Sequence, residues 1–342
     1  IVVEKSTLPV KTASIIKSIL HSSQENISTD DSGKTFSIIS NPEFLAEGTA
    51  IENLKLPDRV LIGGEDRISI DALKNIYLKW IPEKKILTTN LWSSELSKLI
   101  ANAFLAQKIS SINSVSAICE ATGANVNEVA LAVGTDSRIG KKFLKSGPGF
   151  GGSCFKKDIL NLVYICKSLG LYEVAAYWEG IMKINQWQQD RVYKAVVDKL
   201  YGNLTNKRIV VLGFAFKADT NDTRNSPSIE ICKKLLGEGA KLIINDPKVK
   251  SKAIYESLFT NDELPKLREN VIYEENIINA VDNSDAIIIM TDWQNYKNLD
   301  WNNIQLKMRK PGWVFDTRLV LNKDTFKKNK LNFWQLGNGE YC

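Results

Sequence analysis

A glycine-rich segment followed by a cysteine is the part of the sequence whose residue types most directly indicate chemistry. Residues 147–154 read Gly-Pro-Gly-Phe-Gly-Gly-Ser-Cys. Glycines let backbone N–H groups approach a ligand closely. We expect Cys154 just ahead of a helix that begins near Lys156, where the helix dipole and Lys156 and Lys157 favour a thiolate. The pattern predicts an activated nucleophile, and the alternative is a small apolar cysteine in a tight turn.

The same segment also fits the spacing G-x-G-x-x-G, through Gly147, Gly149 and Gly152. A dinucleotide-binding fingerprint of this kind must follow a strand. Residues 141–145 (KKFLK) predict no strand, so we interpret the match as accidental.

Two further pairs of polar residues have helical spacing. Lys98 and Asn102 lie four apart in a largely apolar stretch, which places both on one face of a helix. Such a pair could hold an anionic oxygen, as an oxyanion hole does; a solvated lysine and a locally bonded asparagine is the alternative. Glu43 and Glu47 follow a predicted strand, where ligands bind in α/β folds. Acids that complement a helix N-terminus are the alternative there.

Basic residues near a predicted strand at 209–212 indicate an anion site. Residues 213–217 (GFAFK) follow that strand directly, Arg224 comes soon after, and Arg318 follows the last predicted strand. Lys217, backbone N–H groups and the two guanidinium groups could bind the phosphates or ribose hydroxyls of a nucleotide. Surface arginines are the alternative.

The first part of the chain alternates between strand and helix patterns. Helices are predicted near residues 10–20 and 68–79, and strands at 1–3, 36–40, 60–63 and 86–89. This alternation is typical of a mostly parallel sheet.

The rest of the chain changes pattern twice. Residues 93–119 predict one unbroken helix of roughly seven turns, and three more helices follow, a short one capped by Asn125 with Glu128 and others at 156–168 and 171–200. Beyond Lys207 a second α/β domain is predicted. Its elements are a helix at 226–236 and strands at 209–212, 241–245, 286–290 and 313–316.

These patterns predict the α/β class, with two Rossmann-like doubly wound domains joined by an all-helical central region. We expect the first of these domains to be incomplete. The predicted domains are residues 1–91, 92–203 and 204–342.

Composition excludes several classes of protein. The chain has 342 residues, with 45 Lys+Arg against 39 Asp+Glu, and no apolar stretch of the length that a bilayer requires. We therefore expect neither a membrane protein nor a dedicated nucleic-acid binder, and the length suggests about two domains or two and a fraction. The net charge of +6 is compatible with anionic small molecules as partners.

Cysteine and histidine usage limits the chemistry further. The cysteines are Cys119, Cys154, Cys166, Cys232 and Cys342. They include no C-x-x-C pair, which predicts reduced thiols in a cytoplasmic protein, without disulfides or a metal site. The only histidine is His21, in a polar serine-rich stretch, so we expect no Ser-His or Cys-His mechanism.

The first residues are unusual for the start of a protein. Ile1-Val2-Val3 has the composition of a buried strand, and neither a methionine nor a signal peptide precedes it. Residues 21–34 (HSSQENISTDDSGK) predict an inserted surface loop.

Six blocks, in order, resemble one enzyme family over essentially the whole chain. They are EKST (4–7), SNPEFLAEGTAI (40–51), PDRVLIGG (57–64), WSSELSKL with ANAFLAQ (92–107), GFGGSCF (149–155) and GFAFK (213–217). The family is that of the UDP-glucose/GDP-mannose dehydrogenases, and the blocks are similar to UDP-glucose 6-dehydrogenases of the animal type.

The resemblance implies an NAD-dependent oxidoreductase that oxidises the C6 alcohol of UDP-glucose twice, giving UDP-glucuronate, a glycosaminoglycan precursor. Cys154 would attack the intermediate aldehyde, the thiohemiacetal would give up a second hydride, and water would hydrolyse the thioester. A homo-oligomer is implied as well, either a dimer through the long helix or a hexamer.

The resemblance also implies roles for single residues. Lys98 and Asn102 would stabilise the oxyanion, Asp158 would orient the lysine or the water, Glu43 would assist acid/base steps, and Thr7 would hold a water. The implied NAD-binding residues are Ser6, Thr7, Glu47, Cys154, Lys157 and Arg224. The implied substrate-binding residues are Glu43, Phe44, Leu45, Ala46, Glu47, Lys98, Asn102, Arg138, Lys145, Gly149, Phe150, Gly151, Phe155, Lys217 and Arg318, with Arg138 reaching the neighbouring subunit's substrate.

The chain departs from the family's pattern in a few places. Thr317, Ala218 and Asn221 replace residues common in the family, which bears on affinity. The family also carries a strand and a true G-x-G-x-x-G ahead of the position of Ile1, so we expect residues 1–342 alone to be inactive. The alternatives are a non-catalytic UDP-sugar-binding or assembly subunit and a dehydrogenase for another nucleotide sugar.

Overall fold

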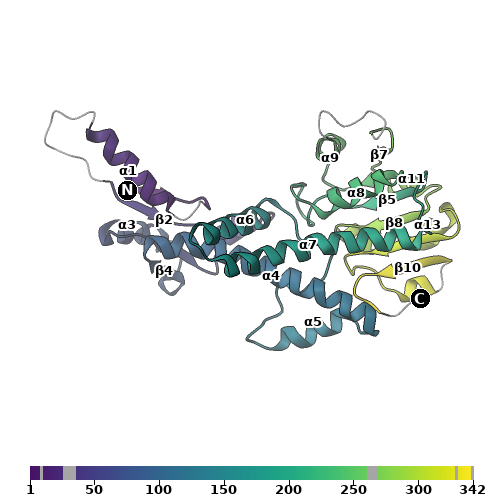
Figure 1. Ribbon diagram of the computed structural model, residues 1–342, viewed down its shortest axis with the longest axis horizontal. Coiled ribbons are helices and arrows are strands. Elements are labelled where there is room, and N and C mark those ends of the chain that lie inside the picture. The colour runs from purple at the N-terminus through teal and green to yellow at the C-terminus, as the bar shows by residue number, and fades with distance from the viewer. Residues whose placement is uncertain (8–10, 26–35, 260–267, 328–329, 340–342) are drawn as a thin grey trace. The chain divides into compact units, whose positions relative to one another are not determined.

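The chain forms two compact units. A computed structural model describes residues 1–7, 11–25, 36–259, 268–327 and 330–339 (Figure 1). One unit comprises residues 1–104 and 158–176, and the other comprises residues 105–157 and 177–342. Three long helices contribute residues to both units: α4 (Leu91–Thr122), α6 (Ser153–Ser168) and α7 (Tyr172–Lys199).

The first unit contains a four-stranded sheet. Its strands, in spatial order, are β1 (Val2–Glu4), β2 (Ile38–Ser40), β3 (Val60–Gly63) and β4 (Ile86–Thr89). Two of the three pairings are parallel, and β2 and β3 meet antiparallel through Ser40 and Gly63. The prediction of a mostly parallel sheet is therefore confirmed, with strand bounds that shift by two residues at most.

Helices α1 (Thr12–Glu25), α2 (Ala50–Lys55), α3 (Arg67–Tyr77) and the short 3-10 helix η1 (Glu83–Lys85) accompany this sheet. The expected loop from His21 is wrong for residues 21–25, because α1 continues through them. The hydroxyls of Ser18 and Ser22 donate to carbonyls of the preceding turn, so these serines stay within the helix. Residues 26–34 of the predicted loop lie outside the described residues.

The central part of the chain is helical, as predicted. Between β4 and β5, a stretch that the structure describes in full, the chain forms α4, α5 (Val126–Thr135), α6 and α7. The left-handed backbone of Gly123, with φ of +79°, ends α4, and the side chain of Asn125 caps α5 by accepting from the N–H of Asn127. Among the described residues Glu128 makes no capping bond to the N–H of Asn125, so that part of the prediction is wrong. Helix α6 begins three residues earlier than predicted.

The second unit contains a six-stranded parallel sheet in the order β10-β9-β8-β5-β6-β7. The strands are β5 (Arg208–Leu212), β6 (Lys241–Asn245), β7 (Val271–Tyr273), β8 (Ala286–Ile289), β9 (Gly312–Asp316) and β10 (Leu331–Gln335). Counted along the chain from β5, this is the 3-2-1-4-5-6 order of doubly wound folds, so the predicted Rossmann-like domain is confirmed. The prediction that residues 313–316 form the last strand is wrong, because β10 follows.

The centre of this sheet is apolar and fully buried. Every residue from Ile209 to Leu212 and from Ala286 to Ile289 is at most 1% exposed. Strands buried on both faces read as continuous apolar runs, which is the pattern of β5 and β8. The accompanying helices are α8 (Pro227–Gly237), α9 (Ser251–Leu258), α11 (Ile277–Ala280), α12 (Gln294–Lys297), α13 (Trp301–Lys307) and α14 (Asp324–Lys327). In the described part of the chain, no helix has the length and apolarity needed to cross a membrane.

Candidate active site

Four predicted catalytic residues lie together in the first unit. Lys98 and Asn102 come from one face of α4, as the spacing predicted, and Asp158 comes from α6. Asn102 Nδ2 donates to Asp158 Oδ2 over 2.5 Å, and Lys98 Nζ lies 3.9 Å from Oε1 of Glu43. Lys98, Asn102 and Asp158 are each 8% exposed or less. The alternative of a solvated lysine is therefore wrong for Lys98. A buried cation, an amide donor and two carboxylates are groups that stabilise or move charge.

The loop after β2 carries the predicted substrate residues 43–47. The N–H of Leu45 donates to Glu43 Oε2 over 2.6 Å, and the N–H of Ala46 donates to Asn53 over 2.9 Å. The ring of Phe44 has two cations near its centroid, the guanidinium of Arg59 at 3.7 Å and Lys98 Nζ at 5.1 Å. Arg59 was not a predicted site residue, although it stands in one of the family blocks.

The start of this loop is anchored by a residue that the sequence did not single out for binding. Asn41 is 2% exposed, and its Oδ1 accepts from Lys5 Nζ over 2.9 Å and from the hydroxyl of Tyr77 over 2.7 Å. Its Nδ2 donates to the carbonyl of Leu61 over 2.7 Å. Asn41 thus ties the loop after β2 to the segment after β1, where Ser6 is exposed and Thr7 is half-buried.

A pair of buried glutamates lies behind that segment. Glu4, at the end of β1, is 8% exposed, and its carboxylate oxygens have no hydrogen-bond partner among the described residues. Burial, and then the charge of Glu95, raise the pKa of Glu4 to about 7. Glu95 accepts from the N–H groups of Lys11 and Ala13 at the start of α1, over 2.9 and 3.1 Å. The sequence analysis did not predict this pair, whose only signal is an acid as the last residue of an apolar strand.

In the second unit, side-chain amides hold the glycine segment. Asn113 on α4 accepts from the N–H of Gly147 over 2.9 Å, and Gln188 on α7 donates to the carbonyl of Gly147 over 2.7 Å. Asn185 bonds both the N–H and the carbonyl of Phe150, over 2.8 and 3.2 Å. Three buried amides from two helices therefore fix the conformation of residues 147–150, and none of the three was predicted.

The glycines of this segment are required by close backbone packing. A Cβ on Gly151 would lie 2.5 Å from the carbonyl oxygen of Asn225, and one on Gly149, with φ of +124°, would lie 2.9 Å from Asn185 Oδ1. The N–H of Gly152 donates to the carbonyl of Arg224 over 2.8 Å. The segment is thus pressed against the loop that follows β5.

Cys154 is the exposed cysteine of the described residues. It lies in the first turn of α6, not ahead of the helix as predicted, because α6 begins at Ser153. The position still places the thiol at the positive end of the helix dipole. Cys119, Cys166 and Cys232 are buried, and burial raises the pKa of each of their thiols, as expected of structural residues. Cys342 lies outside the described residues.

Arg318, which follows β9, lies beside the glycine segment. Its Nε donates to the carbonyl of Met290 over 2.6 Å and its Nη2 to the carbonyl of Phe216 over 3.1 Å. A Cβ on Gly147 would come within 3.3 Å of Arg318 Nη1. This arginine is half-buried, so the surface alternative is wrong for it.

A second cation of the predicted substrate set lies close to Arg318. Lys145 Nζ pairs with Asp292 over 2.8 Å. Burial acts to raise the pKa of Asp292, but the charge of Arg318 and the bond from Lys145 lower that pKa overall. The structure therefore brings Lys145, Arg318 and the glycine segment together in one unit.

The remaining predicted residues are more exposed. Arg224 and Arg138 each bond the aspartate two positions earlier, Asp222 and Asp136, through Nε and Nη2. Lys217 Nζ lies 5.5 Å from the centroid of the Phe216 ring. The ring of Phe155 packs edge-on against that of Phe150, while Glu47 and Lys157 are exposed.

Three parts of the chain match domain models of the same protein family. Residues 1–81 match the NAD binding domain of the UDP-glucose/GDP-mannose dehydrogenase family, residues 92–187 its central domain, and residues 210–323 its UDP binding domain. The predicted domain boundaries near 91 and 203 fall between these matches and stay predictions.

Several curated relatives are similar over almost the whole chain. UDP-glucose 6-dehydrogenase 3 of Arabidopsis thaliana is 51% identical, over 98% of this chain and 72% of the relative. UDP-glucose 6-dehydrogenase 1 of Glycine max is 49% identical over the same shares. These relatives are plant proteins, so the narrower likeness to the animal type stays a prediction.

A solved structure shows the same fold. The UDP-glucose dehydrogenase of the hyperthermophilic archaeon Pyrobaculum islandicum superimposes with a TM-score of 0.81 at 30% identity, over 99% of this chain and 70% of that one.

Proposed function

This chain belongs to the UDP-glucose/GDP-mannose dehydrogenase family, and we propose that it catalyses the NAD-dependent twofold oxidation of UDP-glucose to UDP-glucuronate through Cys154. The observation that carries the proposal is the placement of Cys154. Of the four cysteines that the structure describes, it is the exposed one. It lies in the first turn of a helix and follows a glycine segment that three amides hold. A thiol placed in this way suits covalent catalysis on a carbonyl carbon.

The first oxidation removes a hydride and a proton from the C6 alcohol of the sugar. Glu43 is the proposed base, and Lys98 and Asn102 donate to the oxygen as it gains charge. The 3.9 Å separation of Lys98 and Glu43 supports a role for both in one proton-transfer step. NAD⁺, when bound, supplies the hydride acceptor for both oxidations.

In the second oxidation the Cys154 thiolate adds to the C6 aldehyde and forms a thiohemiacetal. Loss of a second hydride gives a thioester, and water then attacks the acyl carbon, which releases the carboxylate and restores the thiol. We assign the orientation of that water to Asp158, whose carboxylate is held by Asn102, and an ordered water to Thr7. No step requires a histidine.

The residues assigned to the nucleotides fit their charges. Lys217, Arg318 and Lys145 are proposed to hold UDP-glucose, because cations near a glycine segment suit a diphosphate. Lys157 and Arg224 present exposed cations that suit the pyrophosphate of NAD, and the guanidinium of Arg224 is held in place by Asp222. Ser6, Thr7 and Glu47 follow the carboxyl ends of strands, where ligands bind in α/β folds.

Assembly and location are parts of the same proposal. Large apolar side chains are exposed on α4, including Phe104 at 54% and Ile118 at 61%, which supports a homo-oligomer with a dimer contact along this helix or a hexamer built from it. The side chain of Arg138 is 86% exposed and pairs with Asp136. We propose that this exposed guanidinium contacts the substrate of a neighbouring subunit. The free thiols support a cytoplasmic location.

The experiment is a stoichiometry measurement on purified protein in which residues 1–342 follow the strand and G-x-G-x-x-G that the family carries, because residues 1–342 alone are expected to be inactive. We expect two NADH for each UDP-glucuronate formed from UDP-glucose, and no NADH from GDP-mannose. Binding of UDP-glucose without any NADH would favour the non-catalytic subunit, and faster turnover of another nucleotide sugar would favour a sibling dehydrogenase.

A further inference from the structure

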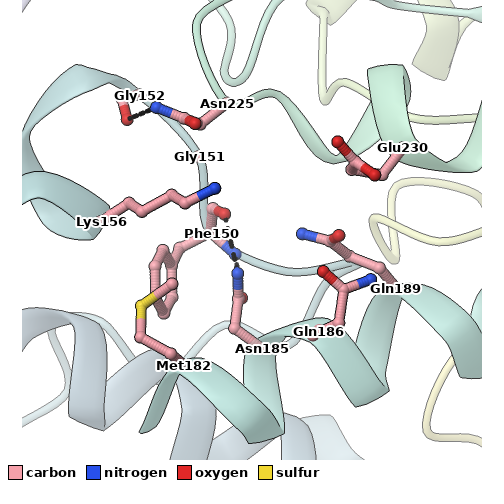
Figure 2. A pocket seen from close by; sticks show the side chains of 10 residues that line it. All are labelled: Phe150, Gly151, Gly152, Lys156, Met182, Asn185, Gln186, Gln189, Asn225 and Glu230. Atoms are coloured by element: carbon pink, nitrogen blue, oxygen red, sulfur yellow. Dashed lines mark hydrogen bonds between the residues drawn. The ribbon is translucent and has the colours of Figure 1, made fainter. Parts of the chain in front are cut away.

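A polar pocket lies in the second unit, beside the glycine segment. It has a volume of about 220 Å³ and is lined by residues from that segment, α6, α7 and α8 (Figure 2). Lys156 reaches into it from the first turn of α6. A helix turns by about 100° per residue, so the side chains of Cys154 and Lys156 leave α6 in roughly opposite directions. Cys154 is not among the lining residues, and the pocket is therefore separate from the proposed nucleophile.

The volume of the pocket restricts what it can hold. A space of about 220 Å³ has room for about seven water molecules at ~30 Å³ each. It is smaller than the ~300–1,000 Å³ pockets that hold drug-sized ligands. A single small ring fits this space, whereas a dinucleotide or a whole nucleotide sugar does not.

One buried side chain in the pocket lacks a partner. Gln189 on α7 is 5% exposed, its carboxamide is directed into the pocket, and its Oε1 has no hydrogen-bond partner among the described residues (Figure 2). The neighbouring Asn185 is satisfied, because it bonds the backbone of Phe150 at both ends. A buried acceptor without a donor costs about 1–3 kcal/mol. The pocket therefore favours an occupant that donates a hydrogen bond to Gln189.

The charges at the pocket select a neutral occupant. Lys156 and Glu230 reach toward it from opposite sides, and their formal charges cancel (Figure 2). Glu230 and the unpaired Gln189 oxygen disfavour an anion, and Lys156 disfavours a cation. The ring of Phe150 and the side chain of Met182 supply an apolar wall for the C–H face of a ring.

We propose that this pocket is a second small-molecule site, which binds one neutral, hydroxyl-rich ring of monosaccharide size. Hydroxyl groups donate and accept, so one ring can satisfy Gln189, Glu230 and Lys156 together. The ligand contacts Phe150 and Gly151 of the glycine segment. This segment continues directly into the first turn of α6, which contains Cys154. Occupation of the pocket thus stabilises the segment that carries the proposed nucleophile. The binding site is inferred from the pocket alone and is independent of the proposed oxidation.

The test is ligand-observed saturation-transfer NMR on the intact protein, with D-glucose as the probe and saturating UDP-glucose to fill the substrate site. We expect transfer to the ring protons of D-glucose. Met182→Trp fills the pocket and should abolish the signal, while Lys183→Trp adds the same side chain at an exposed neighbouring position of α7 and should preserve it. Gln189→Leu should weaken binding about 3–10-fold, the worth of one hydrogen bond.

Glucuronate provides the charge control, because it carries the same ring with a carboxylate. Weaker transfer to glucuronate than to D-glucose supports the proposal. Absence of transfer to D-glucose in the unsubstituted protein would overturn it, as would an equal signal from the protein with Trp at position 182 or stronger binding of glucuronate. NADH formation is measured separately, so failure of this site leaves the proposed oxidation untouched.

Discussion

The amide of Asn102 on α4 donates to the carboxylate of Asp158 on α6 over 2.5 Å, and the two residues are 8% and 1% exposed. The helix containing Asp158 also contains Cys154, one turn earlier. This bond therefore fixes the carboxylate of Asp158, which we assign to the same reaction as Cys154. The donor, Asn102, is itself a residue of the proposed oxyanion site.

Replacing Asn102 should affect both stability and activity. Asn102→Leu removes the amide that donates to Oδ2 of the buried Asp158 carboxylate. We therefore expect the free energy of unfolding to fall by about 1–3 kcal/mol. NADH formation should fall as well, because the oxyanion loses a donor. Denaturant unfolding and initial rates measure the two effects. Asn127→Leu, at an exposed asparagine of α5, is the control and should change neither.

Replacing Cys154 tests the covalent step. Cys154→Ser should lower UDP-glucuronate formation by at least ~10³-fold, as expected for loss of a nucleophile. Cys166→Ser changes a buried thiol whose pKa burial raises, and it should leave turnover nearly intact. In the folded protein, iodoacetamide should label Cys154 faster than Cys166. Equal turnover of the two serine variants would remove Cys154 from the mechanism.

Two glycines with opposite surroundings test the packing of the glycine segment. An alanine Cβ at Gly151 would meet the Asn225 carbonyl at 2.5 Å, so Gly151→Ala should cost about 1–3 kcal/mol and reduce activity. Gly180 lies inside α7 with nothing within 4 Å of the added carbon. Gly180→Ala should stabilise the protein by about 0.5–1 kcal/mol, because the unfolded chain loses freedom. Thermal unfolding of both variants measures this, and a stabilising effect at Gly151 would contradict the described packing.

Much of the fold could be predicted because its strands are short apolar runs with clear ends. The strands at Val60–Gly63, Ile86–Thr89 and Lys241–Asn245 have the predicted bounds. Two strands of the second sheet were missed. β7 has only three residues, and β10 (LNFWQ) has the alternation of a half-buried edge strand without a turn signal of its own.

The candidate site was predicted unevenly for a physical reason. Residues that carry chemistry, such as Cys154 and Lys98, are recognisable from residue type and spacing. Asn113, Asn185 and Gln188 bond backbone groups far away in sequence, and an amide on a helix has the same appearance whether it bonds such a group or solvent. Their role follows from the packing of α4 and α7 against the glycine segment, which no local pattern records.

The buried Glu4 predicts an unusual pH dependence of stability. Its pKa is raised from 4.5 to about 7 in the folded protein, first by burial and then by the charge of Glu95. The folded state therefore binds this proton more tightly than the unfolded state does. The stabilisation from a protonated Glu4 is fully present below pH 4.5 and is lost as the pH rises through about 7. A shift of this size corresponds to ~3 kcal/mol at most.

Glu4→Gln removes the charge that folding must bury, and the groups that face Glu4 decide the size of the effect. Glu95 is occupied by the backbone of Lys11 and Ala13, and Lys5 by Asn41 and Tyr77, so neither offers Glu4 a compensating bond. We expect the variant to match the unsubstituted protein near pH 4.5 and to be more stable than it at pH 8, with the difference growing between these values. Denaturant unfolding across this range measures it, with Glu65→Gln, at an exposed carboxylate of the same unit, as the control that should show no such growth. A variant that is less stable at pH 8 would mean that the charged Glu4 has a partner that stabilises it.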